Sequence, residues 1–103
     1  MRYGIPACAA ALLLSAGCAS SYVAPPAARG ADIFADACAK CHSPLEGRRD
    51  VYFELTPVNR SAEFVANKIR KGGIRMPAYP NLTDEQVRWV ADFVVGHSIE
   101  KTG

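Results

Sequence analysis

Cys38-Ala39-Lys40-Cys41-His42 is the stretch around which this chain is organised. Two thiols three positions apart lie on one face of a helix, so both can bond the two vinyl groups along one edge of a porphyrin. The histidine that follows directly is then held beneath the iron, where an imidazole nitrogen can serve as an axial ligand. The pattern therefore predicts one covalently attached haem c, bonded through Cys38 and Cys41 and ligated by His42.

Two other kinds of site also use closely spaced cysteines. A four-cysteine zinc site needs a second pair of ligands, but the other cysteines, Cys8 and Cys18, lie near the N-terminus in a leader-like region. A thioredoxin-like dithiol needs a βαβ pattern around it, and the sequence shows none. Haem attachment is therefore the favoured interpretation, with a metal site or a dithiol as the alternatives.

Met76 is the candidate for the second axial ligand of the iron, and it is the only methionine after position 1. A thioether sulfur is soft and neutral, so it favours ferrous over ferric iron and raises the reduction potential. Pro77 fixes its own φ and biases Met76 toward an extended backbone, which stiffens a loop that presents a ligand. The alternatives are a core methionine and ligation by His97, whose place past the last helix also suits a cation at a helix C-terminus.

Residues 1–18 have the features of an export signal. Arg2 gives a positive start, an apolar run follows, and small residues precede Cys18. The apolar run is too short to span a bilayer as a stable helix. The end of the segment resembles a bacterial lipobox, although Ser15 stands where a large aliphatic residue is usual. We predict a periplasmic domain attached to the membrane through lipid on Cys18; cleavage by an ordinary signal peptidase is the alternative.

The remainder of the 103-residue chain divides into a tether and one domain. Residues 19–29 are rich in Ala, Pro and Ser, which predicts a flexible tether. Residues 30–103 are enough for one small domain, which we expect to be monomeric. The chain has 12 basic and 10 acidic side chains, and one of the basic residues lies in the export signal. The net charge therefore gives no case for nucleic-acid binding.

Three helices are expected in the domain. Apolar residues repeat at three and four positions through 31–39, on a face that ends at the haem cysteines. Ser61 is a suitable N-cap for a second helix that ends at Lys71, before two glycines. Thr83 and Gln86 form the pattern of a capping box for a third helix, which Gly96 closes.

The segment 43–60 contains Pro44, Gly47 and Pro57, which interrupt regular structure. Val51, Tyr52, Phe53 and Leu55 could form a strand, but we expect an apolar loop packed on a haem edge, with Tyr52 and Phe53 in the core or against the haem. The sequence shows no alternating strand pattern long enough for a sheet. The predicted fold is therefore all-α and haem-centred.

Taken together, these motifs resemble the class I (monohaem) bacterial cytochromes c. The likeness covers residues 30–96 and rests on three segments in order: Gly30 and Phe34 ahead of the haem motif, Met76-Pro77-Ala78-Tyr79-Pro80, and Leu82-Thr83-Asp84-Glu85-Gln86-Val87 with Trp89 and Phe93. The resemblance implies a small cytochrome c fold of three main helices around one haem, with the first helix crossing the last near Gly30 and Phe93. It also implies that His42 and Met76 lie on opposite faces of the iron. A proline carbonyl, from Pro44 or Pro57, would accept the ring N–H of His42.

This reading predicts a one-electron carrier, not an enzyme, in a bacterial periplasmic or membrane-associated redox chain. If Met76 does not ligate the iron, the alternative is a five-coordinate haem gas sensor or peroxidase-like enzyme. A third reading is a permanent haem subunit of a dehydrogenase or oxidase complex. Four basic residues lie just before Met76: Lys68, Arg70, Lys71 and Arg75. They form either a solvated helix face or a surface that steers an acidic redox partner protein.

Overall fold

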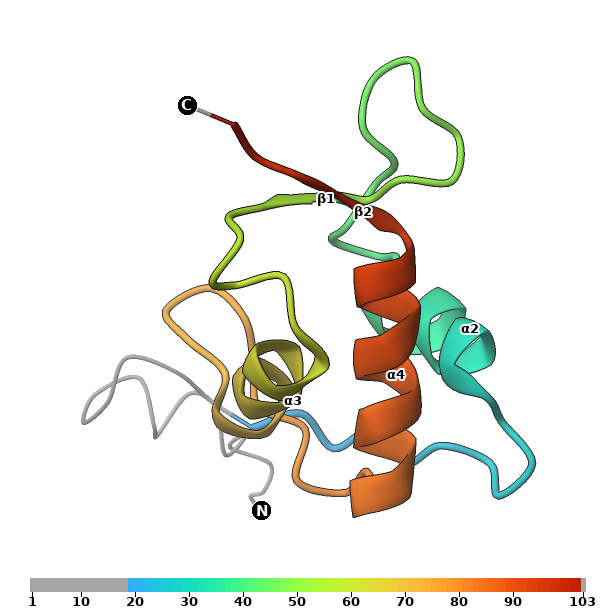
Figure 1. The fold of residues 1–103 in the computed structure, drawn as a ribbon. Helices are drawn as coiled ribbons and strands as arrows, with labels where there is room; N and C mark the ends of the chain where they lie inside the picture. The colour runs from blue at the N-terminus through green and yellow to red at the C-terminus, as the bar shows by residue number, and fades with distance from the viewer. Residues whose placement is uncertain (1–18, 103) are drawn as a thin grey trace.

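The computed structural model describes residues 19–102, so the predicted export signal and Cys18 lie outside the described residues. The helices are α2 (Gly30–Ile33), the π-helical turn η1 (Phe34–Cys38) that continues it, α3 (Ala62–Lys71) and α4 (Asp84–Gly96); the strands are β1 (Phe53–Leu55) and β2 (Ser98–Glu100). Helix α4 packs against both α2 and α3, as Figure 1 shows. None of the helices in residues 19–102 has the length and apolar character that a membrane crossing requires.

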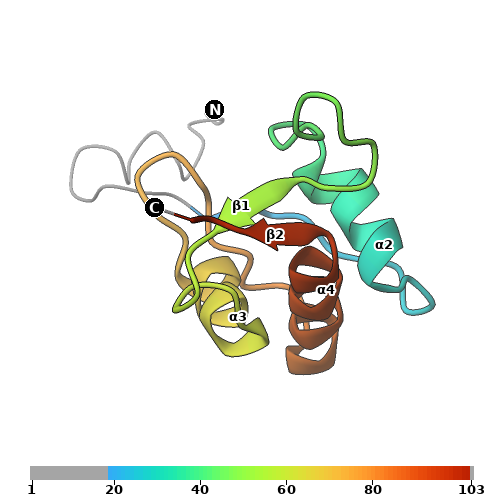
Figure 2. The same cartoon turned by 45° about the horizontal axis from the view of Figure 1, so that its top comes forward.

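The expectation of an all-α fold is wrong, because residues 19–102 form a small parallel sheet and only 38% of them are helical. Strand β1 pairs with β2 in the register Phe53↔Ser98, Glu54↔Ile99 and Leu55↔Glu100. Figure 2 shows the two arrows side by side and pointing the same way. Strand β1 lies in the segment expected to be a loop, and strands of three residues are too short to produce a recognisable alternation.

The first helix begins one residue earlier than predicted and widens in its second half. The carboxylate of Asp32 accepts the backbone N–H of Arg29 at 2.9 Å, which satisfies a donor at the helix start. In η1 the N–H of Ala39 donates to the carbonyl of Phe34 at 2.8 Å, the spacing of a π turn. Such turns occur frequently at functional sites, and this one ends at Cys38.

Helices α2 and α4 cross at Gly30. A Cβ atom at this position would collide with the backbone carbonyl of Trp89 and would lie 3.3 Å from the Cβ of Phe93. Only glycine therefore permits this approach of the two backbones. The cytochrome c resemblance implied this crossing of the first and last helices. It fixes the direction in which α2 and its continuation η1 run relative to α4.

Helices α3 and α4 begin at the predicted caps. The hydroxyl of Ser61 accepts the N–H of Phe64 at 3.1 Å. At α4, Thr83 Oγ1 accepts the N–H of Gln86 at 3.1 Å, and Gln86 Oε1 accepts the N–H of Thr83 at 3.0 Å. The reciprocal pair is a complete capping box, so the start of α4 is determined by local sequence.

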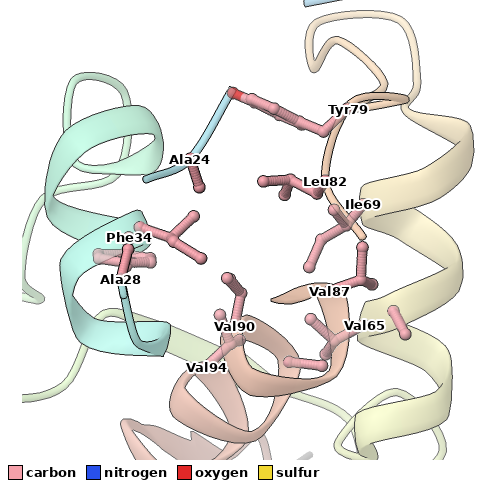
Figure 3. Close-up of a cluster of buried hydrophobic side chains, with 13 residues drawn as sticks. Ala24, Ala28, Phe34, Val65, Ile69, Tyr79, Leu82, Val87, Val90 and Val94 are labelled. Carbon is pink, nitrogen blue, oxygen red and sulfur yellow. The ribbon is translucent and has the colours of Figure 1, made fainter. Parts of the chain in front are cut away.

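The apolar core draws residues from the helices, from the loop before α4 and from the N-terminal segment (Figure 3). Its members are Ala24, Ala28, Ile33, Phe34, Val65, Ala66, Ile69, Tyr79, Leu82, Val87, Val90, Ala91 and Val94. Ala24 and Ala28 belong to the segment predicted as a flexible tether, yet both are buried. These contacts count against free movement of the whole 19–29 segment.

Candidate functional site

Three of the four predicted haem-site residues line one mostly apolar pocket between the helices. Cys38, His42 and Met76 contribute to its wall, together with residues from η1, β1, α3 and α4: Phe34, Phe53, Leu55, Phe64, Val65, Lys68, Ile69, Val90 and Val94. The hollow encloses about 700 Å³ of empty space, counting the part open to solvent.

A second hollow adjoins the first, because Cys38, His42 and Met76 line both. Its remaining lining residues are Ala37, Cys41, Arg75, Pro77 and Tyr79. Cys41 thus joins the other predicted site residues here. Both pockets are thus bordered by the haem motif and by the loop that bears Met76.

The haem motif forms one tight turn at the end of η1. The carbonyl of Cys38 accepts the N–H of Cys41 at 3.1 Å and the N–H of His42 at 3.0 Å. This shared acceptor fixes His42 directly after the π turn. The histidine position is therefore set by backbone hydrogen bonds rather than by the side chain alone.

The two thiols of the motif differ in their surroundings. Cys38 is half-buried and Cys41 is exposed, both are free of disulfide bonds, and they are not in contact with each other. Burial, with a smaller effect of Cys41, raises the pKa of the Cys38 thiol to about 11. Cys38 is therefore a protonated thiol at neutral pH.

The ring of His42 lies among aromatic side chains. Its centroid is 4.8 Å from that of Phe53 and 6.5 Å from that of Phe34. Burial lowers the pKa of His42, so the imidazole is neutral at pH 7 and keeps a lone pair for a metal ion. Within residues 19–102 the ring makes no hydrogen bond, so the carbonyl of Pro44 or Pro57 as its acceptor stays a prediction.

The loop that presents Met76 is fastened at its base by glycines. Gly72 has a φ of +70°, and a Cβ there would approach the backbone of Met76, Pro77 and Ala78 to within 3 Å. The N–H of Gly73 donates to the carbonyl of Met76 at 2.7 Å. Glycine is therefore required at position 72 both for its left-handed conformation and for this close approach.

Tyr79 also fastens this loop, and the sequence did not single it out as a positioning residue. Its backbone N–H donates to the carbonyl of Ile69 at 3.0 Å, and its hydroxyl donates to the carbonyl of Ala37 at 3.1 Å. The side chain is buried. The only signal in the sequence was its place three residues after Met76.

The pocket walls beyond the motif were predicted only in part. Phe53 lines the pocket and Tyr52 packs on Phe34 with ring centroids 4.7 Å apart, so the expectation that both pack in the core or beside the site is confirmed. Leu55 was predicted only as part of an apolar loop at a haem edge, and Phe64 was not recognised as a lining residue. They come from a strand and a helix whose orientation toward the motif is a tertiary property.

His97 lines neither pocket, which removes support for it as an axial ligand. Its ring stacks on that of Phe93 with centroids 4.0 Å apart, and its Nδ1 lies 2.8 Å from the carbonyl oxygen of Asp50. Its backbone N–H is bonded to carbonyls of the last turn of α4. The residue therefore caps this helix and joins it to the 43–52 segment.

Two of the four basic residues before Met76 line the two pockets. Lys68 lines the first pocket, Arg75 lines the second, and Lys71 is exposed on α3. Arg70 lies 3.4 Å from Asp84 and is thereby partly neutralised. Three cations thus remain without a counter-ion among the described residues.

The residues of the site fit a haem. An apolar hollow is bordered by a neutral imidazole and a thioether, the ligand types that hold haem iron in cytochromes c. The described residues contain no group of three or more His, Cys, Asp or Glu side chains arranged to hold a metal ion directly.

Comparison with known proteins agrees with this chemistry. A family model described as cytochrome c oxidase, cbb3-type, subunit III matches residues 25–94. No curated protein and no solved structure matches the chain. The family model supports a c-type cytochrome domain, with haem c and a haem-based role in electron transfer. The chain belongs to the family of cbb3-type cytochrome c oxidase subunit III.

Proposed function

We propose that this protein is a one-electron carrier of the class I cytochrome c type, with a single haem c bonded to Cys38 and Cys41 and ligated by His42 and Met76. The observation that supports it most strongly is the shared position of Cys38, His42 and Met76 on one apolar pocket. When bound, the haem supplies an iron centre that gains and loses one electron.

The protein residues around the site contribute fixed geometry and low polarity. The turn after η1 holds His42, while Gly72 and Gly73 hold the loop of Met76. Two protein ligands that stay in place in both oxidation states leave no open position for small molecules. The apolar walls exclude water and favour the state of lower charge, which raises the reduction potential.

The cell context is part of the same proposal. Attachment of haem c agrees with export through residues 1–18 to the periplasm, and lipid on Cys18 would keep the domain at the membrane surface. Lys68 and Arg75 line the pockets where an electron would enter or leave, and Lys71 lies close to Lys68 on α3. They suit a redox partner with an acidic docking surface.

The family description favours a second candidate, a haem-bearing subunit of a terminal oxidase complex. In that case the domain would pass electrons within a permanent assembly instead of diffusing between partners. The two candidates share the same haem site. Purification from a native membrane in mild detergent separates them, because a subunit copurifies with a larger complex and a free carrier does not.

The proposed ligation is tested by the optical spectrum of the haem-loaded full chain and of its Met76→Ala variant. We expect a low-spin c-type spectrum in the wild type, with a far-red sulfur–iron band that the variant lacks. Ligation by another residue would leave the low-spin spectrum unchanged in Met76→Ala. A high-spin wild type that binds carbon monoxide at once would favour the sensor or peroxidase-like reading.

A further inference from the structure

The N-terminal segment lies directly on the loop that presents Met76. Residues 19–22, here called the N-terminal strap, run beside this loop, and Figure 1 shows the blue start of the described chain close to the orange 72–83 segment. Ala19 and Ala78 form an isolated parallel bridge, and the N–H of Ser20 donates to the carbonyl of Ala78 at 2.7 Å. The amide Nδ2 of Asn81 donates to the carbonyl of Ser21 at 3.3 Å.

The strap acts on a part of the loop that has few bonds of its own. Pro77 and Pro80 have no N–H to donate, so the loop forms few backbone hydrogen bonds with its own donors. Gly73 holds the carbonyl of Met76 from one side, and Ser20 holds the carbonyl of Ala78 from the other. The backbone carbonyls of Met76 and Ala78, on either side of Pro77, are therefore both held by hydrogen bonds.

The other end of the strap reaches the helix that bears the haem motif. The hydroxyl of Tyr22 donates to Oδ2 of Asp36 in η1 at 3.2 Å, two residues before Cys38. A little further on, Ala24 is buried in the same core cluster as Leu82 (Figure 3). The strap thus connects the methionine side of the site with the cysteine and histidine side.

We propose that the N-terminal strap is a positioning segment that keeps Met76 on the haem iron, mainly through the hydrogen bond from Ser20 to Ala78. This inference rests on the proposed His/Met ligation and adds to it a segment that determines how firmly Met76 is held. When the strap is detached, the loop loses its outer fastening and Met76 leaves the iron more readily. The N-terminal segment then determines how well the haem resists foreign ligands.

The inference is tested with the full, haem-loaded chain in its oxidised form, titrated with imidazole. Imidazole competes with Met76 for the iron, so its apparent affinity measures how easily the methionine leaves. Ser20→Pro removes the N–H that bonds to Ala78. A single hydrogen bond of this kind corresponds to a roughly 2- to 10-fold change in an equilibrium constant. We expect imidazole to bind Ser20→Pro tighter by about that factor.

Two matched variants control for the proline and for the lost hydroxyl. Ser21→Pro places the same residue at an exposed neighbour whose N–H makes no hydrogen bond within residues 19–102. Ser20→Ala keeps the N–H and removes only the hydroxyl, which accepts the N–H of Tyr22 at 3.1 Å. Both should bind imidazole as the wild type does. Ser20→Pro in a Met76→Ala background should change nothing, because the strap acts through Met76.

The outcomes separate the strap from the ligation on which it rests. If Met76→Ala leaves the far-red band and the imidazole affinity unchanged, the proposed ligation fails and the strap has no ligand to hold. If Met76→Ala abolishes the band but Ser20→Pro binds imidazole like Ser21→Pro, the ligation stands and the strap inference is overturned. Should Ser20→Pro fail to fold, Asn81→Ala takes its place, with a smaller shift in the same direction expected and no shift overturning the inference.

Discussion

The hydroxyl of Tyr79 donates a hydrogen bond of 3.1 Å to the carbonyl of Ala37, one residue before Cys38. The bond ties the loop of Met76 to the π turn that ends in the haem motif. The tyrosine side chain is buried and Ala37 is partly buried, so removal of the donor leaves the Ala37 carbonyl without its protein partner. The two sides of the site are thus held together by a bond that involves none of the proposed ligands.

Tyr79→Phe should destabilise the haem-loaded protein by about 1 kcal/mol at pH 7, because one buried hydrogen bond is lost. The control is Tyr52→Phe, since the Tyr52 hydroxyl makes no hydrogen bond within the described residues; it should stay within about 0.5 kcal/mol of the wild type. Urea unfolding followed by fluorescence or circular dichroism gives both values. A Tyr79→Phe variant as stable as Tyr52→Phe would contradict the role of the bond.

Ionisation of Tyr79 should lower the free energy of unfolding at high pH. Burial is the main cause that raises the pKa of Tyr79 above its ordinary value of 10.0. Its contribution is therefore fully present below pH 10 and is lost as the pH rises through the folded-state value. Tyr79→Phe should therefore lose less stability than the wild type as the pH rises above 10. Tyr22 has a raised pKa for similar reasons, so part of the alkaline loss should remain.

Gly30→Ala should strongly weaken the crossing of α2 and α4. The added methyl group would meet the backbone carbonyl of Trp89, which no side-chain rotation can move aside. Overpacking of this kind costs about 1–3 kcal/mol. The matched control is Gly96→Ala, at a helical position with no atom within 4 Å of the added Cβ, which should be neutral or slightly stabilising. Thermal unfolding of both variants checks this, and a neutral Gly30→Ala would exclude so close a crossing.

The predictable part of the fold is the part that local chemistry determines. The starts of α3 and α4 follow from Ser61 and from the Thr83–Gln86 capping box, all within four residues of the helix they begin. The sheet was missed because β1 and β2 have three residues each and lie far apart in the chain. Their pairing depends on the direction in which the chain continues after α4 and His97, which no local sequence pattern predicts.

The site divides in the same way. The spacing of Cys38, Cys41 and His42 carries its chemistry within five residues, and Met76 was identified because it has no competitor in the domain. The contacts of residues 19–29 were not predictable from their composition, since Ala, Pro and Ser are also what a flexible linker contains. Their burial comes from the shape of the surface that α4 and the Met76 loop present to them.

Reversing the charge of Lys71 and Arg75 should slow electron transfer to an anionic oxidant. Arg75 lines the second pocket. Lys71 lines a further hollow that shares Phe64 and Lys68 with the first pocket. Neither cation has a counter-ion among the described residues. Hexacyanoferrate(III) serves as a probe of known charge. In stopped-flow mixing with the reduced protein at low salt, Lys71→Glu combined with Arg75→Glu should lower the rate roughly tenfold, with the difference fading as ionic strength rises.

The control for this experiment is Arg88→Glu combined with Lys101→Glu, two exposed cations that line neither pocket. It makes the same change in net charge at other places. If both double variants slow the reaction equally, net charge alone is responsible and the basic rim has no steering role. A wild-type rate that does not depend on ionic strength would also mean that the basic rim has no steering role.

The unequal surroundings of Cys38 and Cys41 should appear as unequal reactivity in the chain before haem is attached. The raised pKa of Cys38, about 11, leaves little thiolate at pH 8, whereas Cys41 is exposed to reagents. Iodoacetamide should therefore modify Cys41 at least roughly tenfold faster, as peptide mass spectrometry measures, and the Cys38 rate should continue to rise up to about pH 11. In strong urea the two rates should converge, because the burial that raises the Cys38 pKa is lost. Equal rates in buffer as well would contradict a preformed turn and would mean that haem attachment itself organises the motif.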